Sequence, residues 1–143
     1  MLVQQILKSK GNASVMTVLP GSRVQDAAKI LAEKRIGTVV ISSDGQKAEG
    51  ILSERDIVRR MADTPGQTLP QSVEDLMTKE VQSCSPDDTL NAVLKTMTEG
   101  RFRHMPVVRD DLLCGMITIG DVVHFRLKEL EYEALRMKQM IVG

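Results

Sequence analysis

Aromatic residues are scarce in this sequence, and neither sign of charge is in excess. Phe102, Phe125 and Tyr132 are the whole aromatic complement, about 2% of the chain. Proteins that hold single-stranded nucleic acid commonly stack successive bases on aromatic rings, and this chain offers few. Lys plus Arg number 19 and Asp plus Glu also number 19, so the overall positive field that attracts nucleic acid is missing. We therefore expect no nucleic-acid partner.

Cysteine is rare as well. Cys84 and Cys114 stand alone, with no C-x-x-C motif and no His at metal-ligand spacing. Because structural zinc is held by sets of such ligands, no metal site is predicted. The two cysteines are typical of small buried residues in a reducing compartment.

Long hydrophobic runs are also absent. No apolar stretch approaches the roughly 20 residues that are needed to span a bilayer. Residues 1–8 lack the basic start, the apolar run and the small-residue cleavage site of a secretory signal. The expectation is a cytoplasmic protein with no membrane partner.

What the chain does have is an internal repeat. Its 143 residues are 42% hydrophobic, which is enough for a buried core. Shifted by 66 positions, one helical series matches the other: Pro20, Val24, Ala27, Ala28 and Leu31 correspond to Pro86, Leu90, Val93, Leu94 and Met97. Apolar residues spaced in this way predict a helix with one buried face in each copy. Ser22 and Asp88 are the predicted N-caps.

A β-rich run follows each predicted helix, over residues 38–41 and 104–108. Turn residues come next, Asp44-Gly45 in one copy and Asp110-Asp111 in the other, and a second apolar run begins at Gly50 or Gly115. Each copy therefore predicts a hairpin that leads into a second helix. The second turn is one residue shorter, so the offset falls to 65.

The predicted fold is α/β (α+β), with strand, helix, strand, strand and helix in each copy of about 60 residues. A short segment precedes each copy, at residues 3–7 and 73–77, and residues 63–72, which contain two prolines, form the linker. We divide the chain into repeat 1, residues 1–65, and residues 66–143, which hold the linker, repeat 2 and a C-terminal helix. Units this small are expected to share one core.

The last predicted helix, residues 121–140, is longer than the repeat requires and extends beyond it. Its apolar residues drift around the helix rather than keeping a strict stripe: Val122, Phe125, Leu127, Leu130, Leu135, Met137 and Met140. Some of these residues could pack against the rest of the same chain. We expect them to pack against a second copy of the chain, which predicts a homodimer.

Each second helix begins at Gly-x-x-Ser/Thr-x-x-Asp, as Ser53-x-x-Asp56 and Thr118-x-x-Asp121. One interpretation is a helix capping box with Asp in the place of Glu or Gln. The other is ligand binding, since a helix N-terminus attracts an anion and an Asp can accept both hydroxyls of a ribose. The two interpretations are compatible.

These pieces, repeated in order, resemble a tandem pair of cystathionine-β-synthase (CBS) repeats, a Bateman module of the stand-alone bacterial type. The residues that carry the resemblance are Val18-x-Pro20, Ser85-Pro86, the strand His104-Met105-Pro106-Val107-Val108 and the two Gly-x-x-Ser/Thr-x-x-Asp runs. The resemblance covers about residues 3–127.

The resemblance implies two clefts related by a pseudo-twofold axis, each able to take an adenosine ligand. AMP is the ligand we expect, with ADP, ATP or NAD(H) as alternatives. One implied cleft is formed by Thr118, Gly120 and Asp121 facing Ile36, Gly37 and Thr38, with Thr17 and Val18 beside the base. The other is formed by Ser53, Arg55 and Asp56 facing Arg103, His104 and Met105, with Ser83 and Cys84 beside the base.

The two implied clefts differ in charge. Arg55, Arg103 and His104 belong to the Asp56 cleft, where we expect phosphate contacts. In the first repeat, Gly37-Thr38-Val39-Val40 replaces the usual apolar-Pro-Val strand, so that segment brings no basic residue to the Asp121 cleft.

The predicted function is a regulatory module that senses an adenine nucleotide and signals to an unidentified effector protein. Catalysis is not expected, because the sequence has no Cys/His or Ser/His/Asp arrangement and no Walker loop. The alternative is a nucleotide-independent CBS scaffold for dimerisation or protein interaction.

Overall fold

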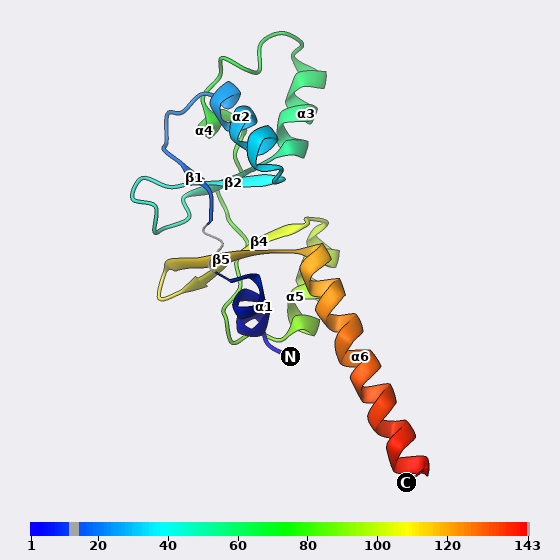
Figure 1. Cartoon of the computed structure of the whole chain (residues 1–143). Helices are drawn as coiled ribbons and strands as arrows, with labels where there is room; N and C mark the ends of the chain where they lie inside the picture. Colours follow the sequence, from blue (N-terminus) through cyan, green and yellow to red (C-terminus); the bar gives the residue numbers. More distant parts are fainter. Residues whose placement is uncertain (12–14, 143) are drawn as a thin grey trace.

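A computed structural model describes residues 1–11 and 15–142 and has the predicted α/β fold (Figure 1). Two small sheets lie face to face at the middle, and the helices cover their outer sides. The elements in chain order are α1 (Val3–Lys10), β1 (Thr17–Val18), α2 (Val24–Lys34), β2 (Thr38–Ile41), β3 (Gly50–Ser53), α3 (Glu54–Asp63), α4 (Val73–Leu76), α5 (Leu90–Gly100), β4 (His104–Arg109), β5 (Leu112–Thr118) and α6 (Ile119–Val142). Within the described ranges, no helix is long and apolar enough to cross a membrane.

The internal repeat is confirmed by equivalent elements. Helices α2 and α5 lie 66 positions apart and bury the predicted stripe, which is Val24, Ala27 and Leu31 in α2 and Leu90, Val93 and Met97 in α5. Both helices end at an arginine in the left-handed conformation, Arg35 (φ 53°) and Arg101 (φ 56°). Since this conformation costs a non-glycine residue about 1 kcal/mol, its repetition shows that the backbone path is shared.

The predicted N-caps of α2 and α5 are wrong by one residue. Arg23 takes that position in α2 without a side-chain cap, and Thr89 takes it in α5, where its hydroxyl accepts from the Ala92 amide at 3.2 Å. The Asp88 carboxylate instead accepts from the Ser85 amide, 2.8 Å away, and so stabilises the turn before the helix. The helices therefore begin one residue later than the residue preference suggests.

Both predicted hairpins are present. Strands β2 and β3 pair antiparallel with Val39 opposite Leu52, and β4 and β5 pair antiparallel with Met105 opposite Ile117. Strand β1 adds to β2 in parallel, with Val18 opposite Ile41. In the second copy the same place is taken by an isolated parallel bridge between Cys84 and Val107.

The buried residues form two clusters rather than the single shared core that we expected. The first unit, as we define it, contains β1, α2, β2, β3, α3 and α4, and the second unit contains α1, α5, β4, β5 and α6. Val3 and Ile6 of α1 pack with Val93, Met105 and Ile117, whereas Val73 of α4 packs with Val24 and Leu52. Each short helix thus completes the core of the unit formed by the other half of the sequence.

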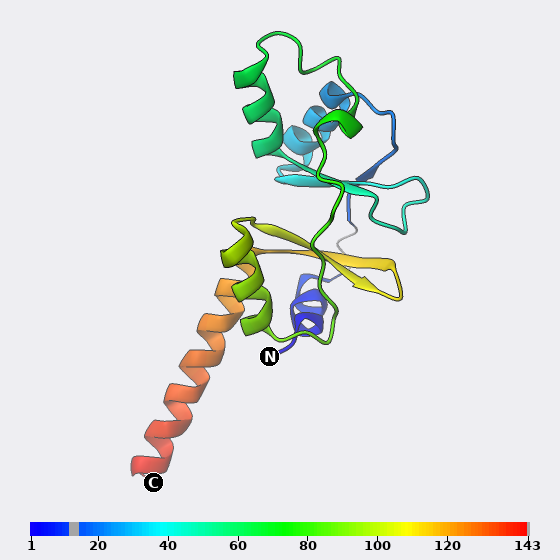
Figure 2. The ribbon, with the colours of Figure 1, turned by 180° about the vertical axis from the view of Figure 1, so that it is seen from behind.

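Equivalent backbone hydrogen bonds anchor the exchanged helices. The Val3 amide donates to the Asp88 carbonyl at 2.9 Å, and the Val73 amide donates to the Ser22 carbonyl at 2.8 Å. The division at residue 65 describes the order of the repeats along the sequence. The two packed units do not follow this division, because each contains a short helix from the other half of the sequence. The chain passes from the second unit to the first before β1 and returns after α4 (Figure 2).

The exchange predicts which unit responds to a change in α1. Ile6 is fully buried, so Ile6→Ala should lower the free energy of unfolding by about 2–5 kcal/mol. Hydrogen exchange should accelerate in β4 and β5 before it does so in β2 and β3. Lys8→Ala, at an exposed position of the same helix, is the control. Faster exchange confined to β2 and β3 would contradict the exchanged packing.

Candidate functional site

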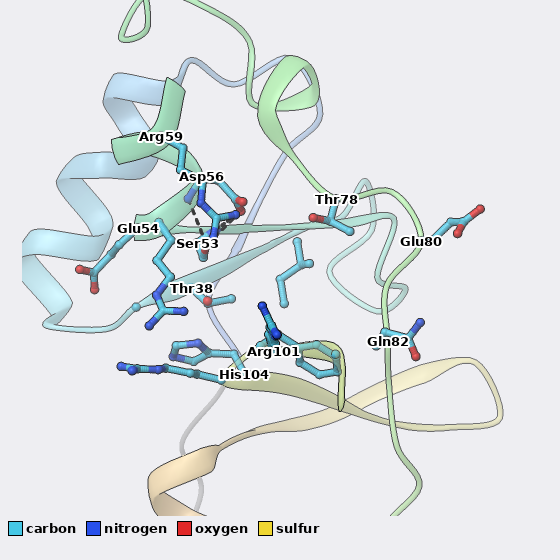
Figure 3. Close-up of a pocket in the computed structure, with 16 residues that line it drawn as sticks. Thr38, Ser53, Glu54, Asp56, Arg59, Thr78, Glu80, Gln82, Arg101 and His104 are labelled. Atoms are coloured by element: carbon cyan, nitrogen blue, oxygen red, sulfur yellow. Dashed lines mark hydrogen bonds between the residues drawn. The ribbon is translucent and has the colours of Figure 1, made fainter. Parts of the chain in front are cut away.

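A pocket of about 420 Å³ lies between the two units. Its first-unit wall comes from the start of β2, from β3 and from the first turns of α3. Its second-unit wall comes from the C-terminal end of α5 and the start of β4, and the segment after α4 closes one side (Figure 3). The lining residues are Gly37, Thr38, Ile51, Ser53, Glu54, Arg55, Asp56, Arg59, Thr78, Glu80, Gln82, Gly100, Arg101, Phe102, Arg103 and His104.

The first turn of α3 is fixed by a capping box, as one of the two interpretations predicted. The Ser53 hydroxyl accepts from the Asp56 amide at 3.3 Å, and Oδ2 of Asp56 accepts from the Ser53 amide at 2.9 Å. The Ser53 hydroxyl also donates to this Oδ2 at 3.0 Å. Both bonds to the Asp56 side chain use the same carboxylate oxygen, so Asp56 caps the helix and still has Oδ1 for a ligand in the pocket that it lines.

The same turn has limited capacity for a phosphate. The Glu54 amide donates to the Gly37 carbonyl at 3.0 Å, and the Asp56 amide is used by Ser53. Two amides that could face an anion are therefore already bonded within the fold. Anion binding in this pocket depends mainly on its cationic side chains.

Four arginines and three carboxylates line the pocket. Arg55 and Arg59 lie one turn apart on α3, while Arg101 and Arg103 lie in the segment between α5 and β4 in the second unit. In Figure 3, Arg101 lies across the pocket from Ser53 and Asp56, and Glu80 points outward. Guanidinium groups from two sides can chelate a phosphate, because each presents a planar set of donors.

His104 is packed against the backbone of the first unit. A Cβ atom added to Gly37 would lie 2.8 Å from Cε1 of His104 and 2.9 Å from Nε2. Burial lowers the pKa of His104; the Glu54 carboxylate raises it, and the charges of Lys10, Arg103 and Arg55 lower it further. The pKa of this imidazole therefore lies below its ordinary value of 6.5, and the ring is neutral at pH 7.

One buried polar atom of the pocket wall has no partner within the described residues. Thr38 is 6% exposed, and its hydroxyl forms no hydrogen bond there. A buried hydroxyl without a partner costs free energy, whereas a ligand or a water molecule in the pocket can satisfy it. Thr38 is therefore a candidate contact for whatever the pocket binds.

The other predicted cleft contains an internal ion pair. Thr118 and Asp121 form an equivalent capping box, with amide-to-oxygen distances of 3.0 and 3.1 Å. Nζ of Lys10, at the end of α1, donates to Oδ2 of Asp121 and to the Met116 carbonyl, both at 2.9 Å. Burial raises the pKa of Asp121, but the bonds from Lys10 and Thr118 outweigh burial and hold the pKa below its ordinary value of 3.8.

The exchanged helices explain why the two capping boxes differ. Val3 and Val73 occupy equivalent places, but α1 continues for eight residues to Lys10, whereas α4 ends after four, at Leu76. Glu80 follows α4 and lines the pocket, but it points outward in Figure 3 and has the wrong charge to pair with Asp56. One cleft therefore contains its own cation, whereas the other must receive cations from its arginines.

The structure brings together part of the predicted site. Ser53, Arg55, Asp56, Arg103 and His104 line one pocket, and Gly37 and Thr38, which the resemblance implied for the other cleft, line it too.

The remaining predicted residues lie elsewhere. Met105 and Val18 are core residues, and Ile36 packs on the core of the first unit. Thr17 pairs with Val40, and Gly120 lies beside Thr118 in the first turn of α6. Cys84 is buried, and burial together with the Asp88 charge raises the pKa of its thiol to about 12. Ser83 lines a separate, smaller hollow with Lys47 and Asp111.

Several lining residues were missed from the sequence. Arg59 could have been found, because it follows Arg55 by four positions on the same helix face. Arg101 and Phe102 adjoin Arg103, so the prediction of Arg103 already pointed to the segment that contains them. Thr78 and Gln82 carry no local pattern, since only the chain crossing after α4 brings them to the pocket.

Comparisons with known proteins agree with this architecture. The family model of the CBS domain matches twice, at residues 8–63 and 73–128. A crystal structure of the CBS-domain protein ATU1752 from Agrobacterium tumefaciens is 40% identical with a TM-score of 0.83, covering 88% of this chain and 99% of that one. The mitochondrial CBS-domain protein CBSX3 of Arabidopsis thaliana is 30% identical, over 99% of this chain and 72% of its own length.

Some of the solved neighbours contain ligands. The CBS domain pair of protein MJ0100, crystallised with 5′-methylthioadenosine and S-adenosyl-L-methionine, is 25% identical with a TM-score of 0.78. The match covers 90% of this chain and 98% of that one. Both of those ligands contain an adenosine group.

The contact between Gly37 and His104 predicts opposite effects for two Gly→Ala substitutions. Gly37→Ala should destabilise the protein by about 1–3 kcal/mol, because the ring or the units must shift. Gly120→Ala places its Cβ 3.6 Å from Oγ1 of Thr118 in a helix, so it should be neutral or stabilising by up to about 1 kcal/mol. Urea unfolding measures both, and equal stability of the two variants would contradict the close approach.

The Lys10–Asp121 pair predicts a pH-dependent contribution to stability. Because the pKa of folded Asp121 is depressed, this contribution is complete above the ordinary pKa of 3.8 and is lost as pH falls through the folded pKa. Lys10→Met should therefore cost about 0.5–1 kcal/mol at pH 7 and less near pH 3. Lys8→Met is the control on the same helix. A cost of Lys10→Met that does not change with pH would exclude the ion pair as its cause.

Proposed function

The chain belongs to the CBS-domain family, and on that premise we propose that it is a regulatory module that binds an adenine nucleotide in the pocket beside Asp56. The single observation that carries the proposal is this pocket of about 420 Å³, where a carboxylate at a helix N-terminus faces arginines of the other unit. Its volume is within the range of about 300–1,000 Å³ that is usual for small-molecule sites.

Each part of a nucleotide has a matching group in the pocket. Oδ1 of Asp56 can accept from the ribose hydroxyls while Oδ2 keeps the capping bonds. Arg55, Arg101 and Arg103 supply cationic donors for phosphate. The purine can lie between apolar groups of Ile51 and Phe102, as ligand sites generally combine apolar walls with a few polar groups.

We infer AMP as the ligand, with ADP, ATP and NAD(H) as the alternatives to be compared with it. All four present the adenosine that Asp56 and the apolar walls would recognise, and they differ in what extends toward the arginines. Nearly equal numbers of acidic and basic side chains line the pocket, which favours a short phosphate over a long one. The Asp121 cleft is proposed as the weaker site, because a ribose there would compete with Lys10.

The proposed module signals by conformation and does not catalyse a reaction. Since both units contribute pocket walls, a nucleotide can bind one relative orientation of the units more tightly than another and shift the population toward it. In this proposal two chains form a homodimer, and a separate effector protein responds to the shift in population. Two free cysteines favour a reducing compartment such as the cytoplasm.

A nucleotide-independent scaffold is the second candidate. It is favoured by the capping boxes, because helix capping alone accounts for Ser53, Asp56, Thr118 and Asp121 without any ligand. The two candidates differ in their response to Asn substitution, since Asn also caps helices well.

Asp56→Asn is therefore predicted to preserve the fold and to weaken AMP binding. Loss of charged hydrogen bonds to the ribose, at about 1.5–3 kcal/mol each, should raise the Kd by tenfold or more. Asp121→Asn is the matched control and should change the Kd less than threefold, a factor worth about 0.6 kcal/mol. Isothermal titration of protein stripped of carried-over ligand gives both values, with ADP, ATP and NADH titrated in turn.

The contrary outcomes are distinct. No heat with any of the four nucleotides would favour the scaffold over the nucleotide sensor. A large loss with Asp121→Asn and none with Asp56→Asn would move the site to the other cleft.

A further inference from the structure

The outer half of α6 extends beyond the body of the molecule. The helix has 24 residues, about 36 Å at 1.5 Å per residue, and it projects from the second unit in both views (Figures 1 and 2). Its contacts with the body come from its first turns, where Val122 is buried and Phe125, Arg126 and Glu129 are half-buried. Residues 130–142 are all exposed.

A regular apolar seam runs along this exposed half. The seam consists of Val123, Leu127, Leu130, Ala134, Met137 and Ile141, whose spacings alternate between four and three residues. This is the heptad pattern of a two-stranded coiled coil, in which Leu127, Ala134 and Ile141 occupy the a positions and the others the d positions. Leu130 is 44% exposed, Met137 64% and Ile141 82%. The apolar residues taken together drift around the helix, as the sequence indicated, but this subset does not.

The seam is not the face that α6 presents to its own chain. At about 100° per residue, Val122, Phe125, Arg126 and Glu129 centre on a direction roughly 100° away from the seam. The Met1 ammonium contacts Glu129 at 2.6 Å on this inner face. The body of the molecule therefore leaves the seam uncovered along its length.

The charges beside the seam identify its partner. Arg126, Glu133, Glu131 and Lys138 occupy the flanking g and e positions. In a parallel pair of identical helices, Arg126 would face the partner's Glu131, and Glu133 would face the partner's Lys138, each contact occurring twice by symmetry. In an antiparallel pair whose seams overlap along their whole length, Glu131 would face Glu131 of the other helix and Glu133 would face Glu133. Like charges would then meet. Of these two arrangements of a second copy, the parallel one is complementary in charge, although Arg126 would have to leave its 3.4 Å contact with Glu129 to take part.

We infer that two copies of this chain associate through a parallel, in-register coiled coil of α6 along the seam. The inference deepens the homodimer of the proposed function and rests on that part of it, but it is independent of nucleotide binding. With fewer than three heptads, the coil gives a contact that dissociates on dilution. Tyr132 and Leu135 lie off the seam and stay exposed in this arrangement.

Disulfide trapping tests the register. Cys114, which is exposed, is first replaced by Ser, and Cys84 is buried. In this background, Met137→Cys places two thiols at the same d layer, so mild oxidation should give mostly covalent dimer. Gln139→Cys, two residues away at the outer f position, is the matched control and should stay monomeric on a denaturing gel.

Exchanging the charges of the residues beside the seam tests whether the partner is a parallel second copy. By sedimentation equilibrium without nucleotide, Glu133→Lys and Lys138→Glu should each raise the dimer Kd about tenfold, and the double variant should restore it. Arg136→Glu, at an outer c position, should leave the Kd unchanged.

Two results overturn the inference in different ways. A Cys114→Ser protein that sediments as a dimer without trapping at Met137 refutes the coil and leaves the homodimer standing. A protein that sediments as a monomer throughout refutes both, and neither result bears on whether AMP binds.

Discussion

The exchange of the short helices α1 and α4 joins the two repeats into one structure. Equivalent amides of the two helices donate to the carbonyl before the main helix of the other repeat, Val3 to Asp88 and Val73 to Ser22, and each helix fills a core that its own repeat leaves open. Because the chain crosses between the units twice, two chain segments connect one unit to the other. The pocket walls that come from different units are thereby held at a limited range of separations.

The exchange also explains why two similar clefts differ. The repeats place Asp56 and Asp121 in equivalent capping boxes, but α1 is long enough to bring Lys10 to Asp121, whereas the shorter α4 ends at Leu76 and brings no cation to Asp56. Lys10 already pairs with Oδ2 of Asp121, and within the described residues each of the two carboxylates accepts its hydrogen bonds at Oδ2. Asp56 lines a pocket with arginines of the other unit instead. The pseudo-symmetric pair therefore differs in the source of its cations, which is internal to the fold at Asp121 only.

Local patterns predicted the repeats, the two hairpins and the capping boxes, because helical spacing, turn residues and caps act over a few positions. The same reasoning failed for the packing partners of residues 3–7 and 73–77, since nothing in those segments says which core they enter. Arg55, Asp56 and His104 could be assigned to one site from the family pattern. Thr78 and Gln82 could not, because they reach the pocket only through the crossing, and the inward position of Lys10 depends on the same exchange.

A crystal structure of the protein grown with AMP would show whether an adenine nucleotide binds beside Asp56 and leaves the Lys10–Asp121 pair intact. We expect the ribose hydroxyls at Oδ1 of Asp56, the phosphate among arginines of both units and the 2.9 Å contact between Lys10 and Asp121 unchanged. AMP at Asp121 with Lys10 displaced, or an empty pocket at saturating AMP, would contradict this expectation.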